Sequence, residues 1–267
     1  MRLFTPLRPD PRAILARANP VAKLGAAAVL MAALFVSTDP VTPAVVLVGL
    51  LTVVPFTGVA PLDLLRRTWP VLLAAVVVGV LNAVFAARPG GEVAVTMGPV
   101  AISDRALLAG LGLGLRLAAI ALSGVLALVT TDPTELADAL VQQLRLSSRV
   151  AVGALAAARL MPIFAAEWQT LALARRARGV TAGRSPIAVV RIFFGELLSL
   201  LVGAVRRGTR LATAMDARGF GSRPCRSIAR PQSMHRGDWI LMGLAAVLAA
   251  VAVGTSLAVG SWRFLLG

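Results

Sequence analysis

Two arginines at the ends of long helical patterns are the residues best suited to a specific chemical task. Arg178 and Arg218 each stand in the triplet Ala-Arg-Gly, within two similar longer phrases. A guanidinium is planar and always charged, and it binds a carboxylate through two parallel hydrogen bonds. Small residues on both sides suit insertion of a helix tip into a partner's groove. The predicted docking residues are Ala177, Arg178, Gly179, Ala217, Arg218 and Gly219, with Arg175 and Arg176 as supporting basic residues.

A purely structural interpretation of these arginines stays open. Arginine in a last helical turn interacts favourably with the C-terminal macrodipole, and glycine commonly follows as the cap. This explains a single such end well. It does not explain why two consecutive helices end in the same triplet. Stabilisation of the macrodipole does not require the alanine, and a lysine would stabilise it as well as the arginine does. We therefore favour docking.

The sequence offers little for catalysis or metal binding. It contains no G-x-x-x-x-G-K-[ST] phosphate loop, no H-E-x-x-H and no paired-aspartate motif. Cys225 is the only cysteine and His235 the only histidine. Neither an intrachain disulfide nor a thiolate metal site can be built from them. We expect His235 to be a solvated loop residue and the chain to be non-catalytic, without a cofactor of its own.

The composition is that of a membrane protein. Of 267 residues, 58% are hydrophobic, and the formal charge of +15 comes almost entirely from arginine. A soluble domain of this length needs far more polar surface. The arginines cluster between and beside apolar segments, as cytoplasmic loops do under the positive-inside tendency. They lack interleaved aromatic residues, so nucleic acid is not an expected partner.

Five apolar segments approach the ~20 residues that cross a hydrocarbon core. They are residues 21–38, 41–56, 69–87, 106–130 and 239–259. The first four form an N-terminal membrane region, 1–131, and the fifth lies in a C-terminal region, 237–267. The basic N-terminus leads into the first segment without an evident cleavage site. We interpret it as the cytoplasmic start of a retained span and not as a signal peptide.

Smaller features of the N-terminal region carry further expectations. Alternating residues around a Gly-Pro pair predict a short outer hairpin at 88–104. The fourth span holds four glycines that allow close helix packing, and it also holds Arg116. An arginine inside a span marks a substrate path or is satisfied within the bundle, and we favour the second interpretation. The four glycines are Gly110, Gly112, Gly114 and Gly124.

Residues 132–236 predict a cytoplasmic or interfacial region of helices. Asp132 and Pro133 begin a short helix that runs to about residue 144. Ser147 or Ser148 then caps a long helix.

The two long helices are expected over 148–178 and 186–218, the first kinked at Pro162. Apolar residues recur on each at steps of three and four, which predicts amphipathic helices at the membrane interface. The two stripes are Val150, Ala154, Ala158, Met161, Ala165, Trp168 and Leu171, and Ile187, Val190, Phe194, Leu197, Leu201 and Val205.

These phrases together resemble the transmembrane (T) component of energy-coupling-factor (ECF) transporters, a branch of the ABC importers. The resemblance covers nearly the whole chain, and the paired arginine triplets are its most specific part. The other matching phrases are Asn19-Pro20-Val-Ala-Lys23-Leu, the stretch from Thr130 to Leu140, Arg159-Leu-Met-Pro162 and the final apolar span.

The resemblance implies an all-α integral membrane protein with about five transmembrane helices and long cytoplasmic coupling helices ending in Ala-Arg-Gly. It implies that Arg178 docks on one ABC-type ATPase and Arg218 on another. ATP and magnesium would be bound by those partners. Movement of the coupling helices would reorient a small membrane protein, the substrate-binding S component, for vitamin or metal-ion uptake. A multi-pass protein of a bacterial or archaeal plasma membrane, with a cytoplasmic N-terminus, is implied.

Three other classes fit less well. A stand-alone secondary transporter needs polar midplane sites in both halves, and the spans offer only Arg116 and Asn82. A membrane-bound enzyme lacks metal and nucleotide residues here. An ordinary ABC permease couples through a single loop in place of two arginine-ended helices. The sequence does not identify the substrate, because the S component would set it, and it leaves a dedicated or shared S component equally open.

Overall fold

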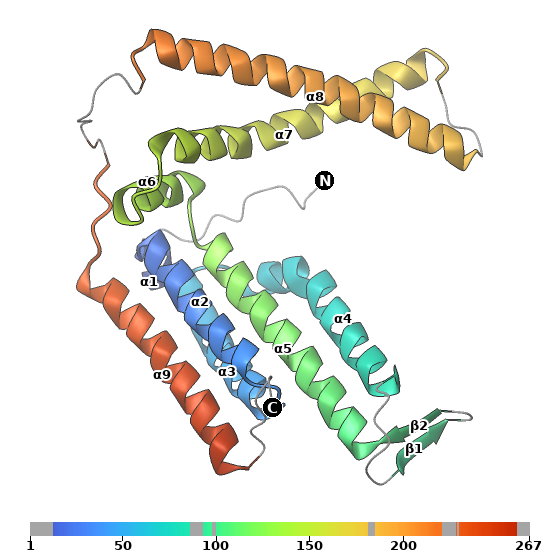
Figure 1. Ribbon diagram of the computed structural model, residues 1–267, viewed down its shortest axis with the longest axis vertical. Coiled ribbons are helices and arrows are strands. Elements are labelled where there is room, and N and C mark those ends of the chain that lie inside the picture. Colours follow the sequence, from blue (N-terminus) through green and yellow to red (C-terminus); the bar gives the residue numbers. More distant parts are fainter. Residues whose placement is uncertain are drawn as a thin grey trace. The chain divides into compact units, whose positions relative to one another are not determined.

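The computed structural model describes residues 13–85, 93–97, 100–180, 185–220, 228 and 230–260. Residues 1–12 and Cys225, on which two expectations rested, lie outside this part of the chain. The described elements are almost all helices (Figure 1). In chain order they are α1 (Ile14–Arg17), α2 (Pro20–Val36), α3 (Val41–Val53), the 3-10 turn η2 (Val54–Thr57), α4 (Pro61–Phe85), β1 (Val93–Met97), β2 (Val100–Ser103), α5 (Asp104–Val129), α6 (Pro133–Gln143), α7 (Ser148–Ala177), α8 (Pro186–Ala217) and α9 (Arg236–Ala258).

The chain divides into two compact units. Met1–Ala139 together with Gln232–Gly267 form the first, called here the bundle unit, and Leu140–Pro231 form the second, the helix-pair unit. In the bundle unit α2, α3, α4, α5 and α9 run side by side (Figure 1). Its apolar core is formed mainly by leucine, valine and alanine side chains of α2, α3, α5 and α9.

Within the part of the chain that the structure describes, five helices are long and apolar enough to cross a membrane: α4, α5, α7, α8 and α9. The expected class, a multi-pass all-α membrane protein, is therefore confirmed, but the identity of the five differs from expectation. The expected spans at 21–38 and 41–56 correspond to shorter apolar helices. At 17 residues α2 rises only ~25 Å, less than a ~30 Å hydrocarbon core. The two expected coupling helices, α7 and α8, meet the length and composition of spans.

Close backbone approach holds α4 against α5, as the glycines of the fourth span led us to expect. A Cβ atom on Gly110 would lie 2.5 Å from the carbonyl oxygen of Gly79, and one on Gly79 would lie 2.8 Å from that of Gly110. Real Cβ atoms do not approach this closely, so any larger residue would force the helices apart. Gly112 is less tightly packed, since a Cβ there would lie 3.3 Å from the Pro40 nitrogen. In contrast, a Cβ on Gly124 would make only ordinary contact with Met31.

Polar groups fix the turns of the bundle unit. Between α2 and α3 the Asp39 carboxylate is buried and accepts hydrogen bonds from the Thr42 backbone N–H at 2.8 Å and from its hydroxyl at 2.9 Å. Asp39 and Pro40 are residue types typical of tight turns, and the chain turns here between α2 and α3. The expected hairpin is also present, with β1 and β2 paired antiparallel.

The helix boundaries largely follow the capping residues. Asp132 accepts a hydrogen bond from the Thr134 N–H at 2.6 Å at the start of α6, and Ser185 accepts one from the Ala188 N–H at 3.4 Å at the start of α8. In α7, Ser147 precedes the helix without a side-chain cap, contrary to expectation. The third expected span began at Trp69, but α4 already begins at Pro61. The charged residues before Trp69 are therefore part of the same helix.

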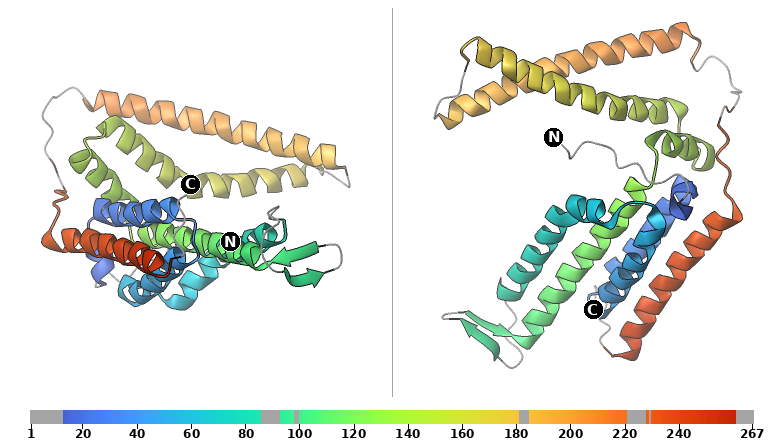
Figure 2. Two further views of the ribbon diagram at one scale, coloured as in Figure 1. Left: turned by 60° about the horizontal axis from the view of Figure 1, so that its bottom comes forward. Right: turned by 180° about the vertical axis from the view of Figure 1, so that it is seen from behind.

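Polar and apolar side chains are more segregated on α8 than on α7, but the exposed Val189, Phe193 and Leu198 of α8 also lie off its expected stripe. Apolar side chains are spread around α7, where alanines fill several faces and the exposed Ile163 and Leu173 lie off the expected stripe. Pro162 lies inside this helix, which is bent (Figure 2).

Candidate functional site

The two Ala-Arg-Gly triplets form the same backbone structure. Each long helix ends at the alanine, with arginine as the C-cap residue. The φ and ψ angles are −85° and 8° at Arg178 and −87° and 9° at Arg218. Gly179 and Gly219 follow with φ of 75° and 71°, in the left-handed region that glycine adopts without steric cost. The repeated triplet therefore encodes a repeated shape.

Matching hydrogen bonds complete the two helix ends. The Gly179 N–H donates to the Arg176 carbonyl at 3.0 Å, and the Val180 N–H donates to the Arg175 carbonyl at 3.0 Å. At the other end Gly219 and Phe220 make the equivalent bonds, at 2.9 Å each. This is the Schellman motif, which satisfies carbonyls that a helix end otherwise leaves free.

Both C-cap arginines present their side chains to solvent. Arg178 and Arg218 are exposed, as are the alanine and glycine on either side of each. Among the described residues, neither guanidinium takes part in a hydrogen bond or an ion pair. Backbone hydrogen bonds alone close the two helix ends. Both guanidinium groups are therefore available to a partner.

The structure places the supporting basic residues differently from one another. Arg176 is exposed beside the first helix end. Arg175 instead reaches across to α8, where its Nη1 donates to the Ile192 carbonyl at 3.0 Å and lies close to Gly195. This contact joins the two helices, and a docking role for Arg175 stays a prediction.

Two further contacts join α7 to α8, and the sequence analysis missed both. The Arg207 guanidinium pairs with the Glu167 carboxylate through two hydrogen bonds, one of them 2.9 Å long, and lies 5.3 Å from the centre of the Phe164 ring. The Trp168 and Phe193 rings lie 5.2 Å apart. The scarcity of acids in this region was the available signal, since Glu167 is one of three between residues 146 and 236.

The helices of this unit cross, and their C-terminal ends lie at opposite ends of the pair (Figures 1 and 2). The contacts above lie between residues 164–175 of α7 and 192–207 of α8. Each arginine-ended tip therefore projects away from the crossing.

An apolar face of α8 is exposed in the helix-pair unit. Large hydrophobic side chains along the expected stripe are between 44% and 78% exposed. A monomeric soluble protein rarely exposes a continuous apolar surface of this kind. The residues are Ile187, Val190, Phe194, Leu197, Leu201 and Val205.

Arg116 has a structural contact inside the bundle unit. Its Nη2 donates to the carbonyl of Ser37, the residue that caps the C-terminus of α2. A cation at this position complements the negative end of the helix dipole. This contact supports the structural interpretation of Arg116 over a substrate path.

The described residues contain no group of three His, Cys, Asp or Glu side chains arranged to hold a metal ion. His235 is exposed, with its side chain 80% accessible, immediately before α9. The expectation that it is a solvated residue is confirmed.

The long apolar helices define a multi-pass membrane protein. Residues 11–227 match the family model described as cobalt transport protein, CbiQ. The chain belongs to this family and is a transmembrane component of the energy-coupling factor transporters.

Several curated proteins are similar to the chain. The energy-coupling factor transporter transmembrane protein EcfT 1 of Listeria monocytogenes is 31% identical over 219 residues, which cover 78% of this chain and 80% of that protein. The EcfT protein of Lacticaseibacillus paracasei is 30% identical over 240 residues, 85% of this chain and 88% of its own length. A putative ABC transporter ATP-binding protein of Bifidobacterium longum is 26% identical over 215 residues, which cover 78% of this chain but only 27% of that protein.

Proposed function

We propose that the chain is the membrane scaffold that couples ATP hydrolysis by two ABC-type ATPase subunits to movement of a substrate-binding S component, for uptake of a vitamin or a metal ion. The observation that carries this proposal is the pair of identical helix ends with exposed arginines. Each fork can bind a carboxylate or carbonyl in a groove of an ATPase. Two tips at opposite ends of one crossed pair suit two ATPase subunits.

The similarity to the Bifidobacterium longum protein supports an ATPase partnership. The matching region makes up about a quarter of a protein named for ATP binding. That protein combines a region similar to this chain with a name that indicates ATP binding, and we extend this association to the chain. ATP and magnesium then belong to the partners, and the chain itself is non-catalytic.

The exposed apolar face of α8 supports the proposed S component. A membrane-embedded partner needs an apolar platform, and the stripe from Ile187 to Val205 provides one. In this arrangement α7 and α8 lie at the cytoplasmic interface, the N-terminus is cytoplasmic, and the membrane is a bacterial or archaeal plasma membrane. The S component sets the substrate.

A pull-down from the organism's own cells in mild detergent tests the proposal. The tagged wild-type chain is expected to bring down two ABC-type ATPases, identified by mass spectrometry. The Arg178→Glu/Arg218→Glu variant is expected to lose them, because a carboxylate repels the acceptors that a guanidinium binds. It inserts normally, since the helix ends are closed by backbone bonds.

A matched control makes the same charge change elsewhere on the same helices. Arg149→Glu/Arg206→Glu alters two exposed arginines away from the tips and is expected to retain both ATPases. Recovery of the ATPases with the tip variant would overturn docking through the arginines. A wild-type chain that comes down alone would favour a stand-alone transporter.

A further inference from the structure

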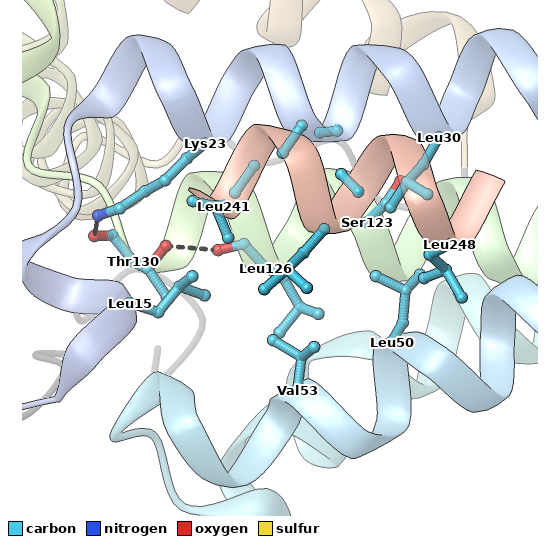
Figure 3. A pocket seen from close by; sticks show the side chains of 15 residues that line it. Leu15, Lys23, Leu30, Leu50, Val53, Ser123, Leu126, Thr130, Leu241 and Leu248 are labelled. Atoms are coloured by element: carbon cyan, nitrogen blue, oxygen red, sulfur yellow. Dashed lines mark hydrogen bonds between the residues drawn. The ribbon is translucent and has the colours of Figure 1, made fainter. Parts of the chain in front are cut away.

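The bundle unit contains an apolar pocket that the docking of ATPases does not use. It lies between α2, α3, α5 and α9, with one residue of α1 at its edge (Figure 3). Its volume is about 140 Å³, and its walls are almost entirely apolar. An engineered protein cavity of about 150 Å³ with such walls stays dry and binds small apolar molecules. The natural occupant of this pocket is therefore expected to be largely apolar.

The pocket reaches the surface of the bundle and extends along its helices. Leu244 of α9 lines it and is 62% exposed. Since α9 is long and apolar enough to cross a membrane, this surface faces acyl chains. Lys23 and Leu30 of α2 line opposite ends of the pocket (Figure 3) and stand seven residues apart, a rise of ~10 Å along a helix. The pocket is thus elongated in the direction in which lipid chains lie.

One end of the pocket carries a buried cation. Lys23 is 4% exposed, and its Nζ donates to the carbonyl of Thr130 at 2.6 Å and to that of Ala16 at 3.2 Å. An ammonium has three donors, so one has no acceptor among the described residues. The hydroxyls of Ser123 and Thr130, also in the wall, both donate to carbonyls of α5. Lys23 is therefore the group in this wall with a donor to offer a ligand.

The charge of Lys23 has no anionic group in contact with it. Asp238 and Glu135 act on it electrostatically, but neither forms an ion pair with it in the part of the chain that the structure describes. The two oxygens of Asp238 instead accept backbone N–H groups, from Asn19 at 2.7 Å and from His235 at 2.8 Å. A buried cation is costly without a contacting partner. The pocket therefore favours a ligand that brings a negative charge to this end.

Lys23 lies where a lipid carries its headgroup. It stands in the first turn of α2, and its acceptor Thr130 is the C-cap of α5. Helix ends lie at the boundary of the hydrocarbon core, where the phosphates of the lipids begin. Basic pockets between membrane helices bind anionic headgroups at this level. A cation at the helix ends and an apolar channel beside the spans match the two parts of a phospholipid.

We propose that the pocket binds one acyl chain of an anionic phospholipid, whose phosphate accepts a hydrogen bond from Lys23. The apolar walls hold the chain whichever headgroup it carries, and Lys23 supplies the preference for a negative one. The proposal concerns the bundle unit alone and does not depend on the ATPases.

Mass spectrometry of the intact full chain, released from detergent micelles, tests this proposal by counting bound lipids. The chain is titrated with phosphatidylglycerol or with phosphatidylcholine that has the same acyl chains. One phosphatidylglycerol per chain is expected to bind about tenfold more tightly than phosphatidylcholine, as one hydrogen bond to a charged group provides. Equal affinity for the two lipids, or no site that saturates at one lipid per chain, would overturn the proposal.

Lys23→Met separates headgroup binding from a purely structural role of Lys23. It is expected to lower the affinity for phosphatidylglycerol about tenfold and to leave that for phosphatidylcholine unchanged. Lys23→Arg retains the cation and is expected to retain the preference. Arg66→Met removes an exposed cation of α4 outside the pocket and is expected to change neither affinity. If Lys23→Met lowers both affinities equally, Lys23 acts only by holding the bundle together and the proposal is wrong.

Leu244→Trp tests the place of the acyl chain without removing a buried group. Its larger ring at the opening is expected to obstruct the pocket and to lower the affinity for both lipids about tenfold. Leu257→Trp makes the same change at an exposed position of α9 outside the pocket and is expected to leave both affinities unchanged. Equal binding by the two tryptophan variants would place the lipid elsewhere on the bundle and contradict the proposal, even where Lys23→Met does not fold.

Discussion

The bundle unit and the helix-pair unit are held together in different ways, and the helices of the bundle unit are the more apolar. Buried residues occur along most of α5, and backbone touches backbone where α4 packs on it. In contrast, α7 and α8 each bury a single residue. Their contacts with each other include one ion pair, one arginine–carbonyl bond and a pair of aromatic rings. Packing specifies the first unit, and a small number of side chains join the second.

This difference suits the proposed scaffold, in which one part stays fixed and the other moves. Close packing leaves the bundle unit few alternative arrangements, because interiors at native density do not deform continuously. A crossed pair joined by few contacts keeps its apolar face and both tips exposed for partners. Because few contacts join the pair, we expect loss of one polar side chain to loosen it. The bundle unit should instead be destabilised by changes in side-chain volume.

The largest expected effect is a volume change in the bundle unit. Gly110→Leu places a side chain where a Cβ alone would lie 2.5 Å from the Gly79 carbonyl oxygen. We expect a loss of about 3 kcal/mol in the free energy of unfolding, at the upper end of the cost of overpacking. Unfolding of the purified chain by SDS titration measures this loss.

Gly124→Ala is the matched control on the same helix. Its Cβ meets only Met31, at 3.5 Å, and alanine favours a helix over glycine by about 1 kcal/mol. Unchanged or increased stability is expected. Equal losses in the two variants would show that α5 tolerates no side chain at any glycine, and the contrast between packed and open positions would be wrong.

A smaller effect is expected from the ion pair that joins α7 and α8. Arg207→Met removes both bonds to Glu167 and the contact with the Phe164 ring. Spin labels on cysteines replacing Leu173 and Ile187, with Cys225 changed to Ser, are expected to show a broader distance distribution. The unfolding free energy of the bundle unit stays unchanged.

Arg206→Met serves as the comparison, because its side chain is exposed one residue away. It is expected to preserve the wild-type distribution. If Arg207→Met also left the distribution unchanged, the rings and the Arg175 bond alone would hold the pair, and the polar contact would be dispensable.

Local signals made much of this molecule predictable. The Asp39 turn and the start of α6 at Asp132 follow from residues whose geometry depends on near neighbours. The glycines of α5 predicted close helix packing, but not that its partner would be Gly79. Identical triplets also gave identical helix ends, because glycine after the cap fixes the backbone irrespective of what surrounds it.

Long-range contacts were not predictable in the same way. Nothing near Glu167 indicates that its partner is Arg207, forty residues later, and nothing near Lys23 indicates the carbonyl of Thr130. Which residues of two helices face each other depends on how the helices are packed in the whole fold, and local sequence does not determine this. The expected stripe on α7 failed for another reason: alanine is small and apolar on every face, so spacing alone suggested a stripe that the helix does not have.

The smallest expected effect lies at the helix tips, where only the shape of the charge changes. Arg178→Lys and Arg218→Lys preserve the cation and the Schellman ends, because backbone bonds close both helices. Lysine donates as a point charge and cannot make two parallel bonds. We expect each variant to recover about threefold less ATPase in the pull-down, within the range measured for single exposed ion pairs. Recovery equal to wild type would mean that the positive charge alone is sufficient for ATPase binding. The planar guanidinium shared by Arg178 and Arg218 would then have no specific role in it.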